Sequence, residues 1–126
     1  MINERIQREA SEQAALFRWV AFIRATLPDA NMLYHIPNGG KRDRREAAKL
    51  KQQGVRAGVP DLCLPVARSG YHGLYIELKA EKNKPTELQL EWLAALKQQG
   101  YAVAVCYGWQ EAANIIENYL GGKFYE

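Results

Sequence analysis

The chain has 126 residues, of which 48% are hydrophobic and 25% are charged, and its formal net charge is +3. This is the composition of one ordinary globular domain, and it excludes a disordered chain, a fibrous protein and a disulfide-rich scaffold. No apolar run approaches the ~20 residues that cross a bilayer, and the charged N-terminus has no signal-peptide core, so we expect a cytoplasmic protein without membrane contact.

The first helical pattern ends at Leu27, because Pro28 stops it. Its start is open between Asn3 and Ser11, since both precede residues compatible with a helix. Residues 1–10 are therefore either part of this helix or a loose N-terminal extension.

A turn and a basic segment follow a short strand that we expect at Met32 to Ile36. Adjacent glycines in the turn let backbone amides approach a phosphate closely. Residues 41–56 carry seven basic and two acidic side chains, a local charge of +5 that is typical of a surface for a polyanion. The residues that we assign to nucleic-acid binding are Asn38, Gly39, Gly40, Lys41, Arg42, Arg44, Arg45, Lys49, Lys51 and Arg56.

Two strands joined by a glycine-containing turn lie between Gly58 and Lys79. Apolar residues alternate with other residues in both halves, which is typical of strands whose two faces differ. If the hairpin is symmetric about Ser69, Asp61 lies directly opposite Glu77, with the two Cβ atoms about 5 Å apart. Glu77 and Lys79 share that face of the strand, because they are two residues apart.

Facing carboxylates normally destabilise a hairpin, so this pair needs compensating positive charge. Lys79 supplies one charge. A hard divalent cation, Mg²⁺ or Mn²⁺, would supply the rest, since Mg²⁺ is typically held by one or two carboxylates together with waters and substrate phosphates. The Leu78 backbone carbonyl is a further candidate ligand, because it points into the same neighbourhood. The alternative is an ordinary ion-pair cluster at a strand edge.

A capping box, Thr86 with Gln89 three residues on, begins the next helix. The apolar run from Tyr101 to Cys106 predicts a buried strand, parallel to the strand before this helix. A final helix is expected over Trp109 to Leu120. The fold class is therefore α/β, a single domain over residues 1–126 with a mixed four-stranded sheet flanked by helices.

Pro60-Asp61 followed by Glu77-Leu78-Lys79 resembles the signature of PD-(D/E)XK nucleases. The surrounding sequence is similar to the VRR-NUC branch of that superfamily, over about Ser11 to Leu120. The segments that carry this likeness are Glu12-Gln13, Phe17, Trp19, His35 to Gly40, Gly54 to Asp61, Gly73 to Lys79, Gln89 to Trp92 and Gly100 to Tyr107. The resemblance implies a PD-(D/E)XK nuclease-like core and hydrolysis of DNA phosphodiester bonds.

The resemblance also implies a separate role for each polar group of the hairpin. Asp61, Glu77 and the Leu78 carbonyl would hold one or two Mg²⁺ or Mn²⁺ ions, and no organic cofactor is expected. The metal would polarise the phosphate and lower the pKa of a bound water. Lys79 would orient that water or stabilise developing negative charge.

Two residues outside the hairpin receive roles from the resemblance alone. It implies that Glu12 turns inward and completes the metal site, and that Gln89 lies beside the catalytic face. Taken without the family, Glu12 is a solvated acid near a helix N-terminus, and Gln89 is explained by its capping box. His35 is either a proton shuttle or a strand histidine satisfied by a neighbour.

Stand-alone members of phage or bacterial type look like homodimeric Holliday-junction resolvases, whose two active sites match the symmetry of a four-way junction. We therefore expect a homodimer that cuts branched DNA in the cytoplasm of a bacterial or phage-infected cell. The apolar candidates for its interface are Trp109, Tyr119, Leu120, Phe124 and Tyr125. Two alternatives stay open, a nuclease specific for flaps or nicks and a module that binds nucleic acid without cutting it.

Overall fold

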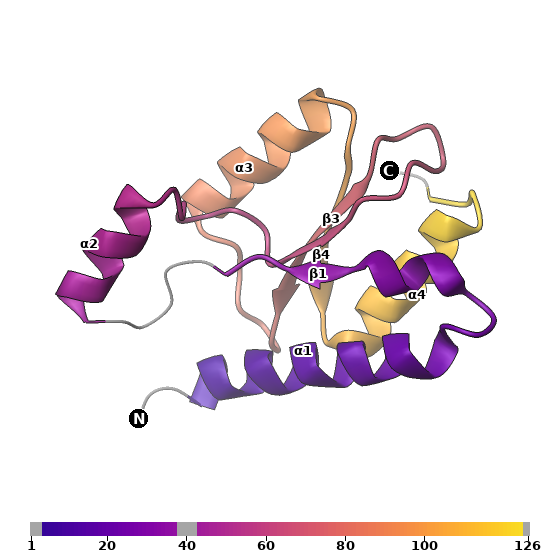
Figure 1. Ribbon diagram of the computed structural model, residues 1–126, viewed down its shortest axis with the longest axis horizontal. Helices are drawn as coiled ribbons and strands as arrows, with labels where there is room; N and C mark the ends of the chain where they lie inside the picture. The colour runs from indigo at the N-terminus through magenta and orange to yellow at the C-terminus, as the bar shows by residue number, and fades with distance from the viewer. Residues whose placement is uncertain (1–3, 38–42, 125–126) are drawn as a thin grey trace.

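The computed structural model describes residues 4–37 and 43–124 (Figure 1). Its helices are α1 (Glu4–Ile23), α2 (Arg44–Gln52), α3 (Glu87–Gln98) and α4 (Trp109–Leu120), with a short 3-10 helix, η1 (Pro28–Met32), after α1. Its strands are β1 (Tyr34–His35), β2 (Leu62–Leu64), β3 (Leu74–Lys79) and β4 (Ala102–Tyr107). Within these described ranges, no helix combines the length and the apolar character needed to cross a membrane.

The four strands form one mixed sheet in the order β1-β2-β3-β4. β1 and β2 pair antiparallel, as do β2 and β3, whereas β3 and β4 are parallel because α3 provides the crossover between them. The predicted fold class, an α/β domain with a mixed four-stranded sheet flanked by helices, is confirmed.

One face of the sheet packs against α1 and α4, which also contact each other. The buried side chains on this side come from the strands and both helices, among them Leu16, Val20, Leu62, Leu64, Leu74, Ile76, Leu78, Ala112 and Ile116. Figure 1 shows α3 across the sheet from α1, and α3 packs against β4. The main core therefore lies between the sheet and the α1–α4 pair.

The β2–β3 hairpin has the predicted register. Leu62 pairs with Ile76 and Leu64 with Leu74, so every pair is centred on Ser69. Ser69 has a φ of 54°, a left-handed conformation that single residues adopt in tight turns. Extending the register by one residue places Asp61 opposite Glu77.

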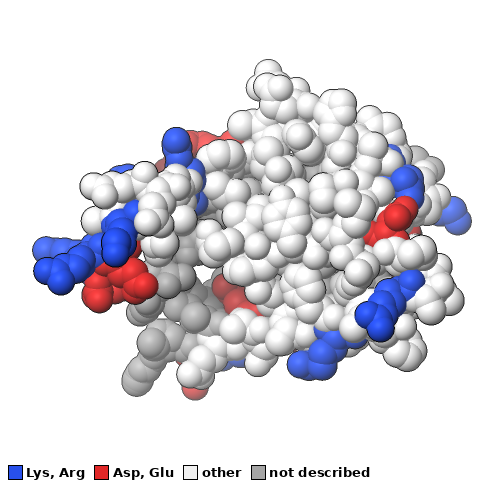
Figure 2. Space-filling view, in the orientation of Figure 1, with Lys and Arg blue, Asp and Glu red and all other residues white. Residues whose placement is uncertain are grey.

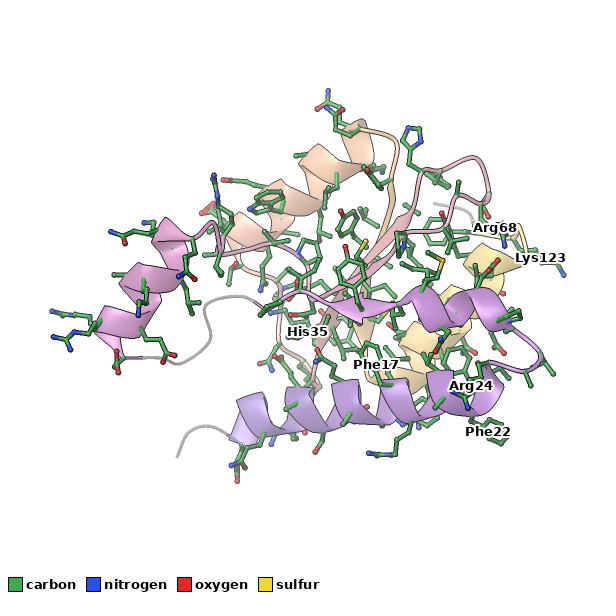
Figure 3. All side chains as sticks on the ribbon, viewed as in Figure 1. Phe17, Phe22, Arg24, His35, Arg68 and Lys123 are labelled. Carbon is green, nitrogen blue, oxygen red and sulfur yellow. The ribbon has the colours of Figure 1, made fainter. Side chains whose placement is uncertain are left out.

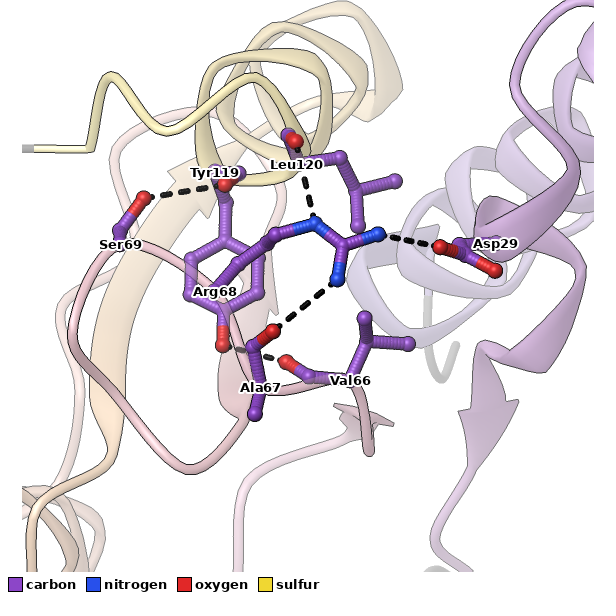
Figure 4. Close-up of polar contacts among 7 residues, drawn as sticks. All are labelled: Asp29, Val66, Ala67, Arg68, Ser69, Tyr119 and Leu120. Atoms are coloured by element: carbon purple, nitrogen blue, oxygen red, sulfur yellow. Dashed lines mark hydrogen bonds and ion pairs between the residues drawn. The ribbon is translucent and has the colours of Figure 1, made fainter.

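Polar contacts tie the hairpin turn to the C-terminal end of α4 (Figure 4). Arg68 Nε donates to the Leu120 carbonyl at 3.3 Å, and the Ser69 hydroxyl donates to the Tyr119 carbonyl at 3.0 Å. The same guanidinium forms an ion pair with Asp29 of η1. The turn is thus fixed by two elements that are distant from it in sequence.

The N-terminal half of the chain selects one of the two helix starts left open and corrects one strand. α1 begins at Glu4, next to the Asn3 alternative, so residues 4–10 belong to the helix. The strand expected at Met32 to Ile36 is shorter, because η1 extends through Met32 and β1 contains only Tyr34 and His35.

The C-terminal aromatic residues are not a free interface. Tyr119, Leu120 and Phe124 are buried, and Trp109 packs against the same core, while Tyr125 lies outside the described residues. The Phe124 ring lies edge-on to the rings of Tyr71 and Tyr119, with centroids 5.6 and 6.1 Å apart. The prediction that these side chains form the dimer interface is therefore wrong for the buried ones, because the tail folds back into the core.

Candidate active site

Three contacts orient Asp61 just before β2. One carboxylate oxygen accepts a hydrogen bond from the Leu78 backbone N–H at 2.8 Å. The Asp61 carbonyl accepts from the Ile36 N–H at 2.7 Å and lies 3.0 Å from His35 Nδ1. Because a carbonyl only accepts, the His35 contact is a hydrogen bond when Nδ1 carries the proton. Neighbouring strand segments on both sides therefore hold Asp61 in place.

Pro60 changes the hairpin ladder beside Asp61. Extending the register by two residues places Pro60 opposite Leu78. The Leu78 N–H points toward β2, and its carbonyl points the same way, because both groups of one residue face the same neighbour in an antiparallel pair. Pro60 has no N–H to donate to that carbonyl. The Leu78 carbonyl therefore lacks the usual cross-strand donor, which suits its expected role as a ligand.

Glu77 is almost completely buried on β3, with 2% of its surface exposed. Its Oε2 atom lies 3.6 Å from Lys79 Nζ. Its Oε1 atom has no hydrogen-bond partner within the described part of the chain. A buried carboxylate oxygen without a partner is costly, so this position favours a cation or a proton.

Burial dominates the electrostatics of the facing pair. Loss of water, followed by the charge of Asp61, raises the pKa of Glu77 to about 8. Burial also raises the pKa of Asp61, while the hydrogen bond from Leu78 opposes that rise. The pair therefore retains a proton at neutral pH, which a bound cation would displace.

A pocket of about 190 Å³ opens beside Asp61. It is lined by Glu9, Ala10, Gln13, His35, Asp61 and Leu78. Figure 3 shows the His35 side chain directed toward α1, which supplies Glu9 and Gln13. The acidic end of the hairpin thus opens onto one face of α1.

Glu9 is the second carboxylate that lines this pocket, besides Asp61, and sequence reasoning missed it. Its Oε2 atom accepts from the Ala80 N–H at 3.3 Å, and its charge helps to raise the pKa of Asp61 behind the larger effect of burial. The available signal was that Glu9 and Gln13 are four residues apart and share a helix face. Glu12 is three residues from Glu9, so the same spacing rule also allows Glu12.

Glu12 has a different position from the one that the family resemblance implied. Its Oε1 atom accepts from the Trp109 N–H at 2.8 Å, at the start of α4. Gly108 precedes that helix and has no side chain to cap it, so Glu12 supplies the acceptor and a charge favoured by the helix dipole. Glu12 is engaged there because α1 packs against α4.

Gln89 forms the predicted capping box with Thr86. The Thr86 N–H donates to Gln89 Oε1 at 2.9 Å, and the Gln89 N–H donates to Thr86 Oγ1 at 3.2 Å. This contact uses the amide oxygen of Gln89 at the start of α3. A catalytic role for Gln89 stays a prediction.

The donor set suits a small, hard cation that keeps several waters. In the described ranges no three His, Cys, Asp or Glu side chains are grouped as a metal site. Mg²⁺ does not require such a cage, since one or two carboxylates with waters and phosphates are sufficient. Asp61, the unpartnered oxygen of Glu77 and the Leu78 carbonyl therefore fit Mg²⁺ or Mn²⁺.

Five of the residues that we assign to nucleic-acid binding are described, and four of them lie on α2. Arg44, Arg45, Lys49 and Lys51 are exposed on α2, which has no buried residue, and Arg56 is exposed after it. The other predicted nucleic-acid contacts lie outside the described residues: Asn38, Gly39, Gly40, Lys41 and Arg42. Figure 2 shows blue side chains over α2 on the same face as a hollow that contains acidic side chains.

A larger cavity, of about 440 Å³, lies beside α2. Among the described residues its lining is mostly apolar, with two cations and no acid: Ala47, Leu50, Lys51, Val55, Arg56 and Ala57. These residues therefore offer no carboxylate to hold a metal ion. The smaller pocket beside Asp61 is the better candidate for chemistry.

Comparisons with known proteins identify the family and the fold. A family model for the VRR-NUC domain matches residues 2–110. A solved structure named "VRR_NUC domain protein" is 30% identical, with a TM-score of 0.77 over 94% of this chain and 93% of that chain. A search of curated proteins finds no match.

Proposed function

Because the chain belongs to the VRR-NUC family, a nuclease-type domain that acts on nucleic acid, we propose that it is a metal-dependent DNA endonuclease with its reaction centre at Asp61, Glu77 and Lys79. One observation carries the proposal. Glu77 is buried opposite Asp61 with one carboxylate oxygen that has no partner among the described residues. A hairpin built for stability alone would avoid such a pair.

A divalent cation held by Asp61, Glu77 and the Leu78 carbonyl would supply Lewis-acid activation of the phosphate and of a bound water. Lys79 lies next to this pair, and its ammonium group stabilises negative charge that develops on the phosphate oxygens. The hydrogen bond from Leu78 keeps the Asp61 carboxylate oriented. Glu9, beside the same pocket, is the third acid that we propose in place of Glu12.

We propose four-way junctions as the preferred substrate and a homodimer as the active form. Resolution of a junction needs two incisions related by a two-fold axis, and the described part of one chain presents one such acidic hairpin. The exposed cations of α2 flank the acidic hollow and would contact the phosphates of the arms.

A cleavage panel tests this function directly. Four-way junction, flap, nicked and linear DNA are incubated with the protein in Mg²⁺, in Mn²⁺ and in a chelator, with Asp61→Asn as the inactive control. We expect metal-dependent paired incisions, fastest on the junction. Faster cutting of flaps or nicks would contradict the junction preference, and binding without cutting by wild type would contradict the nuclease assignment.

Light scattering tests the assembly separately. The free protein and its complex with an uncut junction in Ca²⁺ are compared. We expect two copies of the chain per junction. A single copy in both states would contradict the homodimer and would favour the flap or nick alternative.

A further inference from the structure

Tyrosine side chains form a row across the sheet next to the acidic hairpin. Tyr34 of β1 pairs with Cys63 of β2, and Cys63 pairs with Tyr75 of β3. Side chains two residues apart on a strand share a face, so this row lies on the same face as Asp61 and Glu77. The two rows are separated by two residues, about 7 Å along the strands.

The row is exposed at its β1 end. Tyr34 is 49% exposed, and Cys63 beneath it is buried. At the other end the Tyr75 ring packs edge-on against Tyr101, with centroids 5.2 Å apart. The neighbouring Cys63 side chain, followed by burial, raises the pKa of Tyr34. Tyr34 therefore presents a neutral aromatic surface.

The surroundings of Tyr34 are uncharged apart from the acidic pocket. Figure 1 shows β1 in front of the sheet, and Figure 2 shows an uncharged surface over that region, above the acidic hollow. His35, the next residue, points to the opposite face of β1 and lines the pocket beside Asp61, whereas the Tyr34–Cys63 pair lies two residues from Asp61 on the face that they share. An aromatic surface thus adjoins the position proposed for the scissile phosphate.

A base in a duplex has both faces covered by its neighbours, so only an unpaired base offers a free face to a protein ring. Aromatic side chains bind such bases by stacking, with little dependence on sequence. We infer that Tyr34 is a stacking platform for an unpaired base of the substrate, adjacent to the phosphodiester bond held at Asp61 and Glu77. This inference rests on the proposed nuclease function and requires an unpaired base beside the cut, which a four-way junction supplies only where a base pair at its branch point opens.

A double-mutant cycle between protein and DNA tests the inference. The probe is a fluorescein-labelled duplex with a single-stranded arm, together with copies in which each arm base in turn is replaced by an abasic site. Binding is measured by anisotropy in Ca²⁺, so that cleavage does not interfere. The variants are Tyr34→Leu, which keeps apolar cover over Cys63, Tyr34→Phe, which keeps the ring, and Phe22→Leu.

Phe22 provides a matched control. It is an exposed aromatic residue, 81% exposed, and Figure 3 shows it at the far end of α1 from the region of His35. We expect Phe22→Leu and Tyr34→Phe to bind like wild type. We expect Tyr34→Leu to bind the armed DNA about tenfold more weakly, with unchanged affinity for fully paired DNA.

The coupling decides the result. At one arm position the abasic site should cost wild type about tenfold and cost Tyr34→Leu nothing further. The stacking role would be overturned if the losses of affinity caused by Tyr34→Leu and by the abasic site were independent at every arm position. It would also be overturned if Tyr34→Leu bound the armed DNA as tightly as Phe22→Leu does.

Cleavage by wild type in Mg²⁺ or Mn²⁺ is scored separately. If wild type cuts DNA but Tyr34→Leu and the abasic site show no coupling, the stacking role is wrong and the nuclease function stands. If they show coupling but wild type does not cut, the nuclease function is wrong and the stacking contact stands. If wild type binds neither the armed nor the fully paired DNA, both are wrong.

Discussion

The Asp61 carboxylate accepts a hydrogen bond from the backbone N–H of Leu78 at 2.8 Å, across the two strands of the hairpin. The contact uses the Leu78 N–H that faces β2, whereas the proline before Asp61 leaves the Leu78 carbonyl without a backbone N–H donor. The hydrogen bond holds the Asp61 carboxylate in place beside Glu77.

Asp61→Asn removes the charge of Asp61 and keeps an oxygen that can accept from Leu78. We expect the substitution to abolish cleavage and to leave the metal-free protein within about 1 kcal/mol of wild type, or more stable, because it removes a charge that burial disfavours and keeps the acceptor for Leu78. Metal at 100 times its Kd should stabilise wild type by about 2.7 kcal/mol, and the variant should lose most of that gain. Thermal melts with and without Mn²⁺ measure both effects. A destabilised variant that keeps its response to metal would make Asp61 a purely structural acid.

The stability of the metal-free protein should fall as the pH rises. The pKa of Glu77 is raised from 4.5 to about 8, chiefly by burial and next by Asp61, so between these values the folded state binds a proton that the unfolded state does not. The stabilisation is fully present below pH 4.5 and is lost as the pH rises through 8. Urea unfolding at several pH values gives the free energy of unfolding of wild type and of Glu77→Gln. The same dependence of this free energy on pH in both proteins would contradict the raised pKa of Glu77.

Glu9 and Glu12 offer a matched pair on one helix. Glu12→Ala removes the acceptor at the start of α4, so we expect a loss of about 1 kcal/mol of stability with cleavage retained by the folded protein. Glu9→Ala removes the acid beside Asp61, so we expect weaker metal binding and slower cleavage. Metal titrations and cleavage rates at a temperature where both variants are folded separate the roles. The opposite pattern would restore Glu12 to the metal site.

The cations of α2 should provide affinity and not chemistry. Arg44→Ala combined with Arg45→Ala should weaken DNA binding. It should also make the slope of the logarithm of the affinity against the logarithm of the salt concentration shallower by about 0.9 per lost phosphate contact. Single-turnover cleavage at saturating protein should be largely unchanged. Arg24→Ala, in the turn just after α1 and away from His35 (Figure 3), is the control. A salt slope equal to that of the control would remove α2 from the interface.

Gly58 sets the path of the chain into Asp61. Its φ is 90°, and a Cβ atom there would lie 2.7 Å from Leu88 Cγ and 3.1 Å from the Leu88 backbone. Gly58→Ala should therefore cost at least about 1 kcal/mol of stability and slow cleavage, since the loop must shift. Gly54→Ala is the control, because its φ is also positive and nothing lies within 4 Å of the added atom. Equal stabilities of the two variants would show that Leu88 yields freely.

Local patterns in the sequence predicted much of the fold. The hairpin register followed from alternation about Ser69, and the start of α3 followed from the Thr86–Gln89 capping box. Both depend on residues that are close in sequence or related by one turn. The bounds of α4, Trp109–Leu120, also followed from its apolar spacing and the glycines after it.

Features that depend on docking were not predictable in this way. Glu9 and Glu12 lie within one turn of α1, and only the packing of α1 on α4 decides which one meets Asp61. The aromatic tail was expected to be free because no local pattern shows that Phe124 reaches the core. In both cases distant elements determine the environment of a residue.

The contacts of Arg68 and Ser69 with the end of α4 make the hairpin turn part of the same cooperative unit as that helix. Exposed turns usually open on their own and exchange their amide hydrogens quickly. Here the turn cannot separate without releasing the carbonyls of Tyr119 and Leu120. The backbone amides of the turn and of the last residues of α4 should therefore exchange at similar rates, and loosening the C-terminus would loosen the strands that position Asp61 and Glu77.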